Sequence, residues 1–176
     1  DIGPSWHKNK QGTPTMGGFM FIFAILIASV VGYFMLSQGK NDLWHGTQVE
    51  IARYWGTILL AVSFGIIGFV DDYIKVVKKR NLGLTAIQKL ALQLAAAGAY
   101  LALLRWNGDL TCDLYIPFWN VSFEINWIVY LIFAMFVIVG CVNAVNLTDG
   151  IDGLASGVTL PVMVFFAVTA WMWGKT

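Results

Sequence analysis

Two adjacent acidic residues, Asp71 and Asp72, stand at the end of a long uncharged stretch, and Lys75 follows them. On a continuing helix Lys75 lies four residues from Asp71 and three from Asp72, so one ammonium group can face both carboxylates. Adjacent carboxylates repel each other and are costly to desolvate, so they usually share a cation. This acidic pair predicts either a helix end with a local ion pair or a site for a general base and a divalent metal such as Mg²⁺.

A second polar group follows another apolar stretch. On a continuing helix a spacing of three residues places polar side chains on one slowly drifting face. Gly150 and Gly153 would leave the backbone there open to close approach by a ligand. Such a stripe suits hydroxyl, imide and metal partners, whereas a capped helix break would account for only one of its members. The amides and carboxylates that recur at this spacing are Asn143, Asn146, Asp149 and Asp152.

A third group precedes the first apolar stretch. The segment from Lys8 to Gly18, KNKQGTPTMGG, combines cations, hydroxyls and small residues, among them Lys10 and Thr15. Cations and hydroxyls before a helix N-terminus can form a cradle for a phosphate or another anion. The Gly-x4-Gly-Lys order of a P-loop is absent. An ordinary turn rich in Pro and Gly, with lysines that mark the cytoplasmic side, explains the segment as well.

The composition indicates that membrane helices position these groups. Of the 176 residues, 58% are hydrophobic and 12% are charged, whereas soluble domains carry about 25% charged residues. The net charge of +1 means that the chain lacks the excess of positive charge typical of proteins that bind nucleic acids. A helix needs about 20 apolar residues to cross the hydrocarbon core. We predict an all-α polytopic membrane protein, a single integral membrane domain over residues 1–176, with five transmembrane helices near residues 16–36, 54–74, 84–104, 127–145 and 154–173.

The distribution of Lys and Arg predicts the orientation. Seven of them fall before residue 16, between 70 and 90 and between 142 and 153, and four fall on the opposite side. Because cytoplasmic loops are enriched in Lys and Arg, the N-terminus and all three polar groups are expected at the cytoplasmic face. On the outer side, apolar and polar residues alternate around Pro117 and Asn120, which predicts a short β-hairpin within residues 105–127.

The three groups together resemble the phospho-N-acetylmuramoyl-pentapeptide transferase (MraY) family. The resemblance rests on Gly12-Thr-Pro-Thr-Met-Gly-Gly18, on Asp71-Asp72-x-x-Lys75, and on NAVNLTDGIDGL from Asn143 to Leu154, and it runs over nearly the whole chain. The acidic pair and a version of the third motif also occur in the wider superfamily of polyprenyl-phosphate N-acetylhexosamine-1-phosphate transferases. The Thr-Pro-Thr-Met form is the more specific part and points to the muramoyl branch.

The resemblance implies a reaction in peptidoglycan synthesis. Phospho-MurNAc-pentapeptide would pass from UDP-MurNAc-pentapeptide to undecaprenyl phosphate, giving lipid I and UMP, with Mg²⁺ as cofactor. The implied place is the cytoplasmic face of the bacterial inner membrane. The implied partners are the two substrates and the lipid bilayer, with a homodimer as a further possibility and no nucleic acid.

The resemblance also implies roles for individual residues. Asp71 would be the base for the lipid phosphate or a nucleophile, and Asp72 would support the metal and the diphosphate, so both are candidate catalytic residues and Mg²⁺ ligands. Lys75 would orient the acidic pair. The remaining candidates are Lys10 and Thr15, which would bind the nucleotide-sugar, and Asn146, Asp149 and Asp152, which would line the uridine and diphosphate pocket.

The chain departs from the family in one respect, because family members have more transmembrane helices, a further metal-binding Asp and a His-rich cytoplasmic loop. We therefore expect this chain to be the front half of such an enzyme and to need the second half for turnover. Two alternatives stay open. One is a UDP-GlcNAc:polyprenyl-phosphate GlcNAc-1-phosphate transferase, which differs in sugar preference. The other is a noncatalytic transporter or scaffold, although a transporter should carry polar residues near the bilayer centre.

Overall fold

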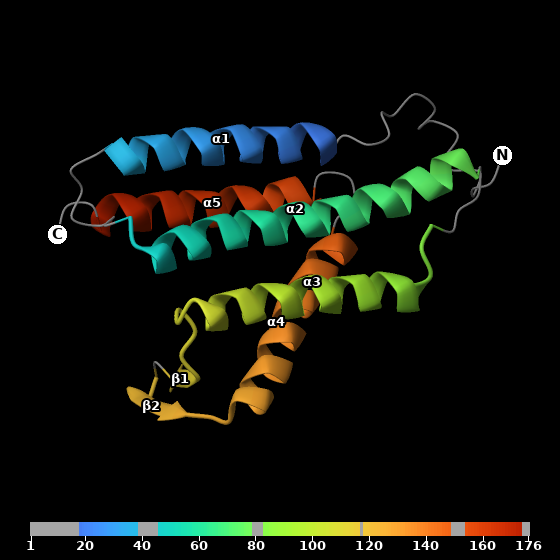
Figure 1. Ribbon diagram of the computed structural model, residues 1–176. Helices are drawn as coiled ribbons and strands as arrows, with labels where there is room; N and C mark the ends of the chain where they lie inside the picture. Colours follow the sequence, from blue (N-terminus) through green and yellow to red (C-terminus); the bar gives the residue numbers. More distant parts are fainter. Residues whose placement is uncertain (1–17, 39–45, 79–82, 117, 149–153, 174–176) are drawn as a thin grey trace. The chain divides into compact units, whose positions relative to one another are not determined.

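The computed structural model describes residues 18–38, 46–78, 83–116, 118–148 and 154–173. Five helices within these ranges are long and apolar enough to cross a membrane, and a two-stranded sheet lies between the third and the fourth (Figure 1). The predicted all-α polytopic membrane protein with a short hairpin within residues 105–127 is confirmed. The helices are α1 (Gly18–Gln38), α2 (Gln48–Val77), α3 (Ala86–Trp106), α4 (Trp127–Thr148) and α5 (Leu154–Trp173), and the strands are β1 (Asp113–Ile116) and β2 (Val121–Glu124).

The chain divides into two compact units, residues 1–135 and residues 136–176. In the first unit α2 packs against both α1 and α3 (Figure 1). The second unit holds the remainder of α4 and all of α5. The assignment of residues 1–176 to one membrane domain stays a prediction.

Capping boxes fix where α2 and α3 begin. The Thr47 hydroxyl accepts a hydrogen bond from the Glu50 backbone N–H at 3.2 Å, and the Glu50 carboxylate accepts one from the Thr47 N–H at 2.9 Å. Thr85 and Gln88 form the same reciprocal pair before α3. Such boxes satisfy backbone donors that have no partner inside the helix. Helix α2 therefore begins at Gln48, well before residue 54, even though its first turns carry charge.

Helices α2 and α3 approach closely because α2 has a glycine at the contact. A Cβ built on Gly56 would lie 2.9 Å from a methyl carbon of Leu103 in α3. The face of α3 that packs inward includes Ala97 and Leu101, which are 0% and 3% exposed. Helix α1 is held to α2 by the Tyr54 hydroxyl, which donates to the Ser29 carbonyl oxygen at 2.7 Å. Close backbone approach at small residues is typical of membrane helix packing.

The hairpin pairs β1 and β2 antiparallel, with Asp113 opposite Glu124. Its turn contains Asn120 with a φ of 51°, and the Tyr115 hydroxyl donates to the Asn120 side-chain oxygen at 2.9 Å. Asn tolerates this left-handed conformation better than most residues. The Arg105 guanidinium carbon, near the end of α3, lies 4.4 Å from the ring centroid of Trp127, where α4 begins. This cation–π contact joins the end of α3 to the start of α4, on either side of the hairpin.

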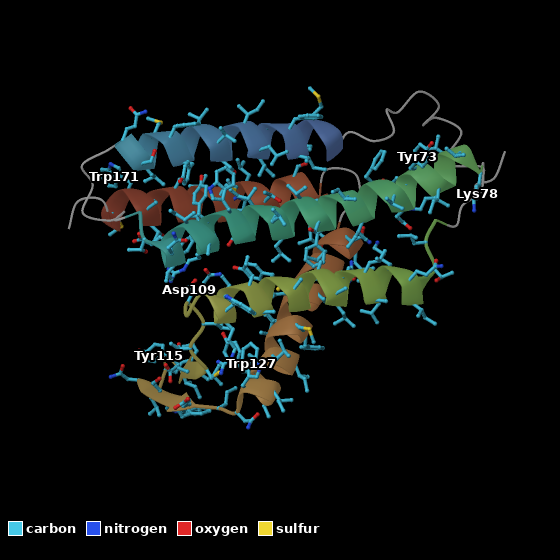
Figure 2. The ribbon with its side chains drawn as sticks, in the orientation of Figure 1. Tyr73, Lys78, Asp109, Tyr115, Trp127 and Trp171 are labelled. Atoms are coloured by element: carbon cyan, nitrogen blue, oxygen red, sulfur yellow. The ribbon has the colours of Figure 1, made fainter. Side chains whose placement is uncertain are left out.

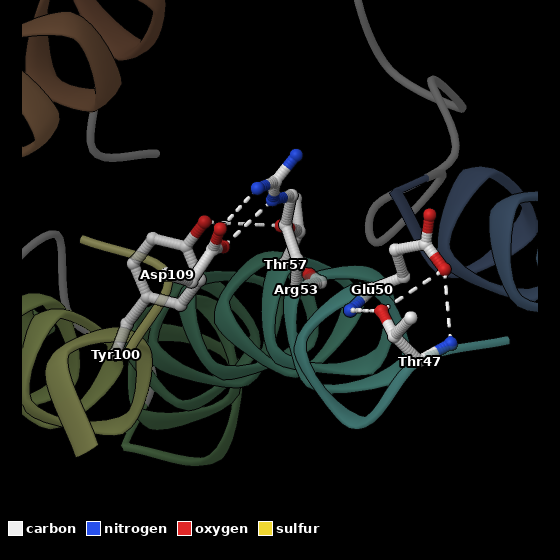
Figure 3. A network of polar contacts seen from close by, with 6 residues as sticks. All are labelled: Thr47, Glu50, Arg53, Thr57, Tyr100 and Asp109. Atoms are coloured by element: carbon white, nitrogen blue, oxygen red, sulfur yellow. Dashed lines mark hydrogen bonds and ion pairs between the residues drawn. The ribbon is translucent and has the colours of Figure 1, made fainter. Parts of the chain in front are cut away.

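An ion pair joins α2 to the end of α3 (Figure 3). Gly108, with a φ of 74°, follows α3, and the Asp109 backbone N–H donates to the Leu104 carbonyl oxygen at 3.0 Å. This is the hydrogen-bond pattern of a Schellman motif. It places Asp109 against Arg53 of α2, whose Nε donates to the Asp109 carboxylate at 2.6 Å. The Asp109 side chain is 5% exposed, so the carboxylate partner of this ion pair is buried.

A second polar contact lies beside this ion pair. The hydroxyl oxygens of Thr57 in α2 and Tyr100 in α3 are 3.0 Å apart (Figure 3). The Thr57 hydroxyl already donates to the Arg53 carbonyl oxygen at 2.8 Å, so the Tyr100 hydroxyl is the donor between the two helices. Both contacts therefore fix α2 and α3 at the same end. Figure 2 labels Asp109 at this end and Tyr73 and Lys78 at the opposite end of α2.

The ion pair predicts an acid-sensitive contribution to stability. The hydrogen bond from Arg53 holds the pKa of Asp109 below its ordinary value of 3.8, against the opposing effect of burial. Because the folded-state pKa is the lower one, the stabilisation is fully present above the unfolded-state pKa and is lost as the pH falls through the folded-state value. We expect Asp109→Asn to lower the free energy of unfolding at neutral pH by about 1 kcal/mol. In detergent, the gap in melting temperature between variant and parent should shrink below pH 3.8.

The matched control is Asp113→Asn in β1, a nearby carboxylate for which no ion pair is found among the described residues. This control should leave the neutral-pH melting temperature close to that of the parent. An Asp109→Asn variant as stable as the parent at neutral pH would contradict the stabilising role of the pair.

Candidate functional site

The acidic pair lies in the last turns of α2, and Lys75 binds both of its members as the helical spacing predicts. The Lys75 Nζ atom is 2.7 Å from Asp71 Oδ2 and 3.0 Å from Asp72 Oδ1. One ammonium group thus neutralises part of the repulsion between two neighbouring carboxylates. The three side chains form a single charged group at the end of the helix.

The two carboxylates differ sharply in their surroundings. The Asp71 side chain is 13% exposed, whereas that of Asp72 is 56% exposed. The second oxygen of Asp71, Oδ1, accepts a hydrogen bond from the Leu84 backbone N–H at 2.8 Å. Asp71 is therefore held at both oxygens, while Asp72 contacts Lys75 through Oδ1 and presents most of its side chain to the surroundings.

The loop that supplies this backbone donor was not identified from the sequence. Gly83 and Leu84 immediately precede the N-cap Thr85, so the capping box marks them as the end of a turn. The spacing of residues does not indicate that this turn reaches back to Asp71, because the contact joins residues 13 positions apart. The structure adds both residues to the surroundings of the acidic pair.

Of the other predicted site residues, Asn146 alone belongs to the described ranges. Asn146 is exposed in the last turn of α4, which belongs to the second unit. Asn143, three residues earlier on the same helix, donates through Nδ2 to the Val139 carbonyl oxygen at 2.9 Å. Lys10, Thr15, Asp149 and Asp152 all lie outside the described residues.

The donor chemistry of the acidic pair fits a magnesium ion that takes further ligands from elsewhere. Within the described part of the chain, no cluster of three or more His, Cys, Asp or Glu side chains could hold a metal. Mg²⁺, however, is usually bound by one or two carboxylates together with phosphate oxygens and water. Asp72 is the more accessible donor, since both oxygens of Asp71 already accept bonds from Lys75 and Leu84.

The shared cation predicts strong coupling between Lys75 and Asp71. Lys75→Met removes the cation from two carboxylates, and this should cost less stability when Asp71 is already neutral. In a double-mutant cycle with Asp71→Asn we expect a coupling free energy of about 1 kcal/mol. The cycle is measured by thermal unfolding in detergent at neutral pH.

Lys78→Met provides the matched cycle, since no ion pair of Lys78 is found among the residues that the structure describes. Its coupling to Asp71→Asn should be close to zero. Equal coupling in the two cycles would mean that the Lys75 contact has no specific energetic role.

Comparison with known proteins gives matches over most of the chain. The family model of glycosyl transferase family 4 matches residues 54–176. The model of phospho-N-acetylmuramoyl-pentapeptide-transferase signature 1 matches residues 10–22. These two matches together cover the acidic pair, the stripe of amides and carboxylates, and the third group from residue 10 onward, and they confirm the resemblance drawn from the sequence.

Curated relatives named phospho-N-acetylmuramoyl-pentapeptide-transferase agree with these matches. Those from Oceanobacillus iheyensis and Bacillus subtilis are 41% and 42% identical over 169 residues, which is 96% of this chain. The relative from Listeria welshimeri is 43% identical over 170 residues, which is 97% of this chain. Each match covers 48% of the relative, so the chain spans about half the length of the curated relatives it matches.

Proposed function

The chain belongs to glycosyl transferase family 4 and carries signature 1 of the phospho-N-acetylmuramoyl-pentapeptide-transferases, and on this premise we propose its reaction. Phospho-MurNAc-pentapeptide passes from UDP-MurNAc-pentapeptide to undecaprenyl phosphate, which gives lipid I and UMP for peptidoglycan synthesis. The observation that carries the proposal is the signature at residues 10–22, because it favours the muramoyl donor over UDP-GlcNAc. The names of the curated relatives support the same donor.

In this proposal the two carboxylates of the acidic pair have different roles. Asp71 acts on the lipid phosphate, either as the base that takes its proton or as a nucleophile, and the contacts with Lys75 and Leu84 hold its carboxylate in place. Asp72, which is the more exposed, binds Mg²⁺ and faces the diphosphate. When bound, Mg²⁺ supplies neutralisation of the diphosphate charge. Lys75 offsets part of the charge of the two carboxylates and so lowers the repulsion between them.

The remaining candidates bind the soluble substrate. Lys10 and Thr15 contact the nucleotide-sugar, and the amide and carboxylate stripe lines the pocket for uridine and diphosphate. This division suits the reaction, because an anionic donor needs cations and hydroxyls while a uracil ring needs amide and carboxylate partners. The members of the stripe that we assign to this pocket are Asn146, Asp149 and Asp152.

The chain is a multi-pass membrane protein, and we place its site at the cytoplasmic face of the bacterial inner membrane. Two arguments support this placement. The Lys and Arg residues are distributed seven to four in favour of that side. The donor is a soluble nucleotide-sugar, whereas the acceptor is a lipid whose phosphate lies at the membrane surface. The proposed partners are these two substrates, the second half of the enzyme and, as a homodimer, another copy.

The central test is product formation by the detergent-solubilised chain. It is assayed alone and together with a second chain that carries the remaining half of the Bacillus subtilis relative. With undecaprenyl phosphate and Mg²⁺, we expect UMP and lipid-linked product from UDP-MurNAc-pentapeptide and none from UDP-GlcNAc. Asp71→Asn should lower turnover by about 100-fold or more, because it removes a proton acceptor at the reacting group.

Asp113→Asn in the hairpin serves as the matched carboxylate control and should turn over like the parent. Product from UDP-GlcNAc alone would contradict the muramoyl donor. Full turnover by Asp71→Asn would remove Asp71 from the mechanism. Removal of Mg²⁺ with a chelator should abolish product, and unchanged turnover would exclude the metal.

Lys10→Ala tests the binding of the nucleotide-sugar. We expect its KM for UDP-MurNAc-pentapeptide to rise while kcat changes little, because the lost cation contacts the donor in the ground state and in the transition state alike. Steady-state kinetics over a range of donor concentrations measures this. Lys40→Ala, on the predicted opposite face, is the control, and an unchanged KM in Lys10→Ala would exclude the proposed contact.

A further inference from the structure

The turn between α2 and α3 folds back onto Asp71. Leu84 comes 13 residues after Asp71, and its backbone N–H donates to Asp71 Oδ1 at 2.8 Å. This bond lies on the side of the carboxylate away from Lys75, which binds the other oxygen, Oδ2. Two donors on two different oxygens fix the rotation of the carboxylate plane as well as its position. Hydrogen bonds to an ionised acceptor are among the stronger ones in proteins.

Gly83 makes this approach possible because it has no side chain. A Cβ built on Gly83 would lie 2.3 Å from Asp71 Oδ1, 2.4 Å from the Asp71 carbonyl oxygen and 2.8 Å from Asp71 Cγ. The carbonyl oxygen belongs to the backbone of α2 and cannot move aside like the end of a flexible side chain. Gly83 does not have a positive φ, so the space beside Asp71, rather than backbone conformation, requires a glycine.

The backbone donor is anchored independently of the charged group. Thr85, the next residue after Leu84, is the N-cap of α3 and forms a complete capping box with Gln88. The start of α3 thus determines where the Leu84 N–H lies. Lys75, by contrast, is a long side chain that is 37% exposed and is shared with Asp72. A group that binds Asp72 can therefore draw Lys75 away, while the Leu84 bond to Asp71 remains.

We propose that Gly83 and Leu84 form a positioning turn for Asp71, in which the missing side chain of Gly83 admits the carboxylate and the Leu84 N–H holds its orientation toward the lipid phosphate. The inference rests on the proposed function for the role of Asp71, and it adds two residues that act through Asp71. Neither residue touches the substrate in this proposal. Misplacing a reacting group by about 1 Å can cost on the order of 100-fold in rate.

Gly83→Ala is the first test, with Gly68→Ala as its matched control. Gly68 lies on α2 three residues before Asp71, and a Cβ built on it meets nothing within 4 Å. In the product assay described above, we expect Gly83→Ala to lower kcat by about 100-fold while the KM for both substrates stays near that of the parent. Gly68→Ala should keep the parental kcat. A parental kcat in Gly83→Ala would overturn the proposal.

Leu84→Pro is the second test, because proline removes the N–H and adds no atom at position 83. Its control is Leu84→Ala, which keeps the N–H. We expect a loss of kcat in Leu84→Pro and none in Leu84→Ala. Equal losses in the two variants, or a joint change of kcat, KM and melting temperature in Gly83→Ala, would indicate a merely structural turn and overturn the proposal.

A readout that needs no turnover separates this inference from the proposed function. In chain labelled with ¹⁵N-leucine, the Leu84 amide signal is identified by its loss in Leu84→Ala. Its proton should move upfield in Asp71→Ala, which removes the acceptor, and stay in place in Asp72→Ala. An unmoved signal in Asp71→Ala overturns the positioning turn, whereas an active Asp71→Asn variant overturns the catalytic role of Asp71 instead.

Discussion

Hydrocarbon cannot hydrate a charged group, and this constraint determines how α2 is built. Between Tyr54 and Val70 the helix carries no charged residue, and its charged side chains lie toward its ends. Each of these charges is costly near lipid unless it has a partner. Arg53 pairs with Asp109 at one end, and Lys75 is shared by two carboxylates at the other. The ion pairs found among the described residues therefore lie at the two ends of one helix.

Helix α3 ties both of these ends to the same rigid element. Its capping box at Thr85 positions the Leu84 N–H on Asp71, and the Schellman motif after Trp106 positions Asp109 on Arg53. Close to the Arg53 end the helices also meet at Gly56, where a Cβ would contact Leu103. The length of α3 thus sets the distance between two turns that each contact α2. Sliding α2 along α3 would break the contacts at both ends at once. Only one alignment of the two helices therefore keeps all of these contacts.

The features that the sequence predicts correctly depend on local periodicity. Five apolar runs predict five helices, alternating residues around Asn120 predict the hairpin, and the spacing from Asp71 to Lys75 predicts the shared cation.

Contacts that depend on loop closure were not predictable. Arg53 and Asp109 are 56 residues apart, and the Leu84 bond to Asp71 needs the turn to fold back on the helix. The early start of α2 was missed because charge at residues 50 and 53 suggested a loop, whereas the Thr47 capping box and the partner of Arg53 stabilise helix there. The functional roles of all the candidate site residues stay predictions, and four of these residues, Lys10, Thr15, Asp149 and Asp152, lie outside the described ranges.

Helix geometry itself gives the two adjacent carboxylates different environments. Consecutive residues on an α-helix point about 100° apart, so when one faces a packed neighbour the next turns away from it. Asp71 faces the turn before α3 and is 13% exposed, and Asp72 is 56% exposed. The reaction that we propose would need one carboxylate of fixed orientation for the lipid phosphate and one that can accept a cation. Two neighbouring aspartates on a helix packed on one side meet both needs, and the turn at Gly83 decides which of them is fixed.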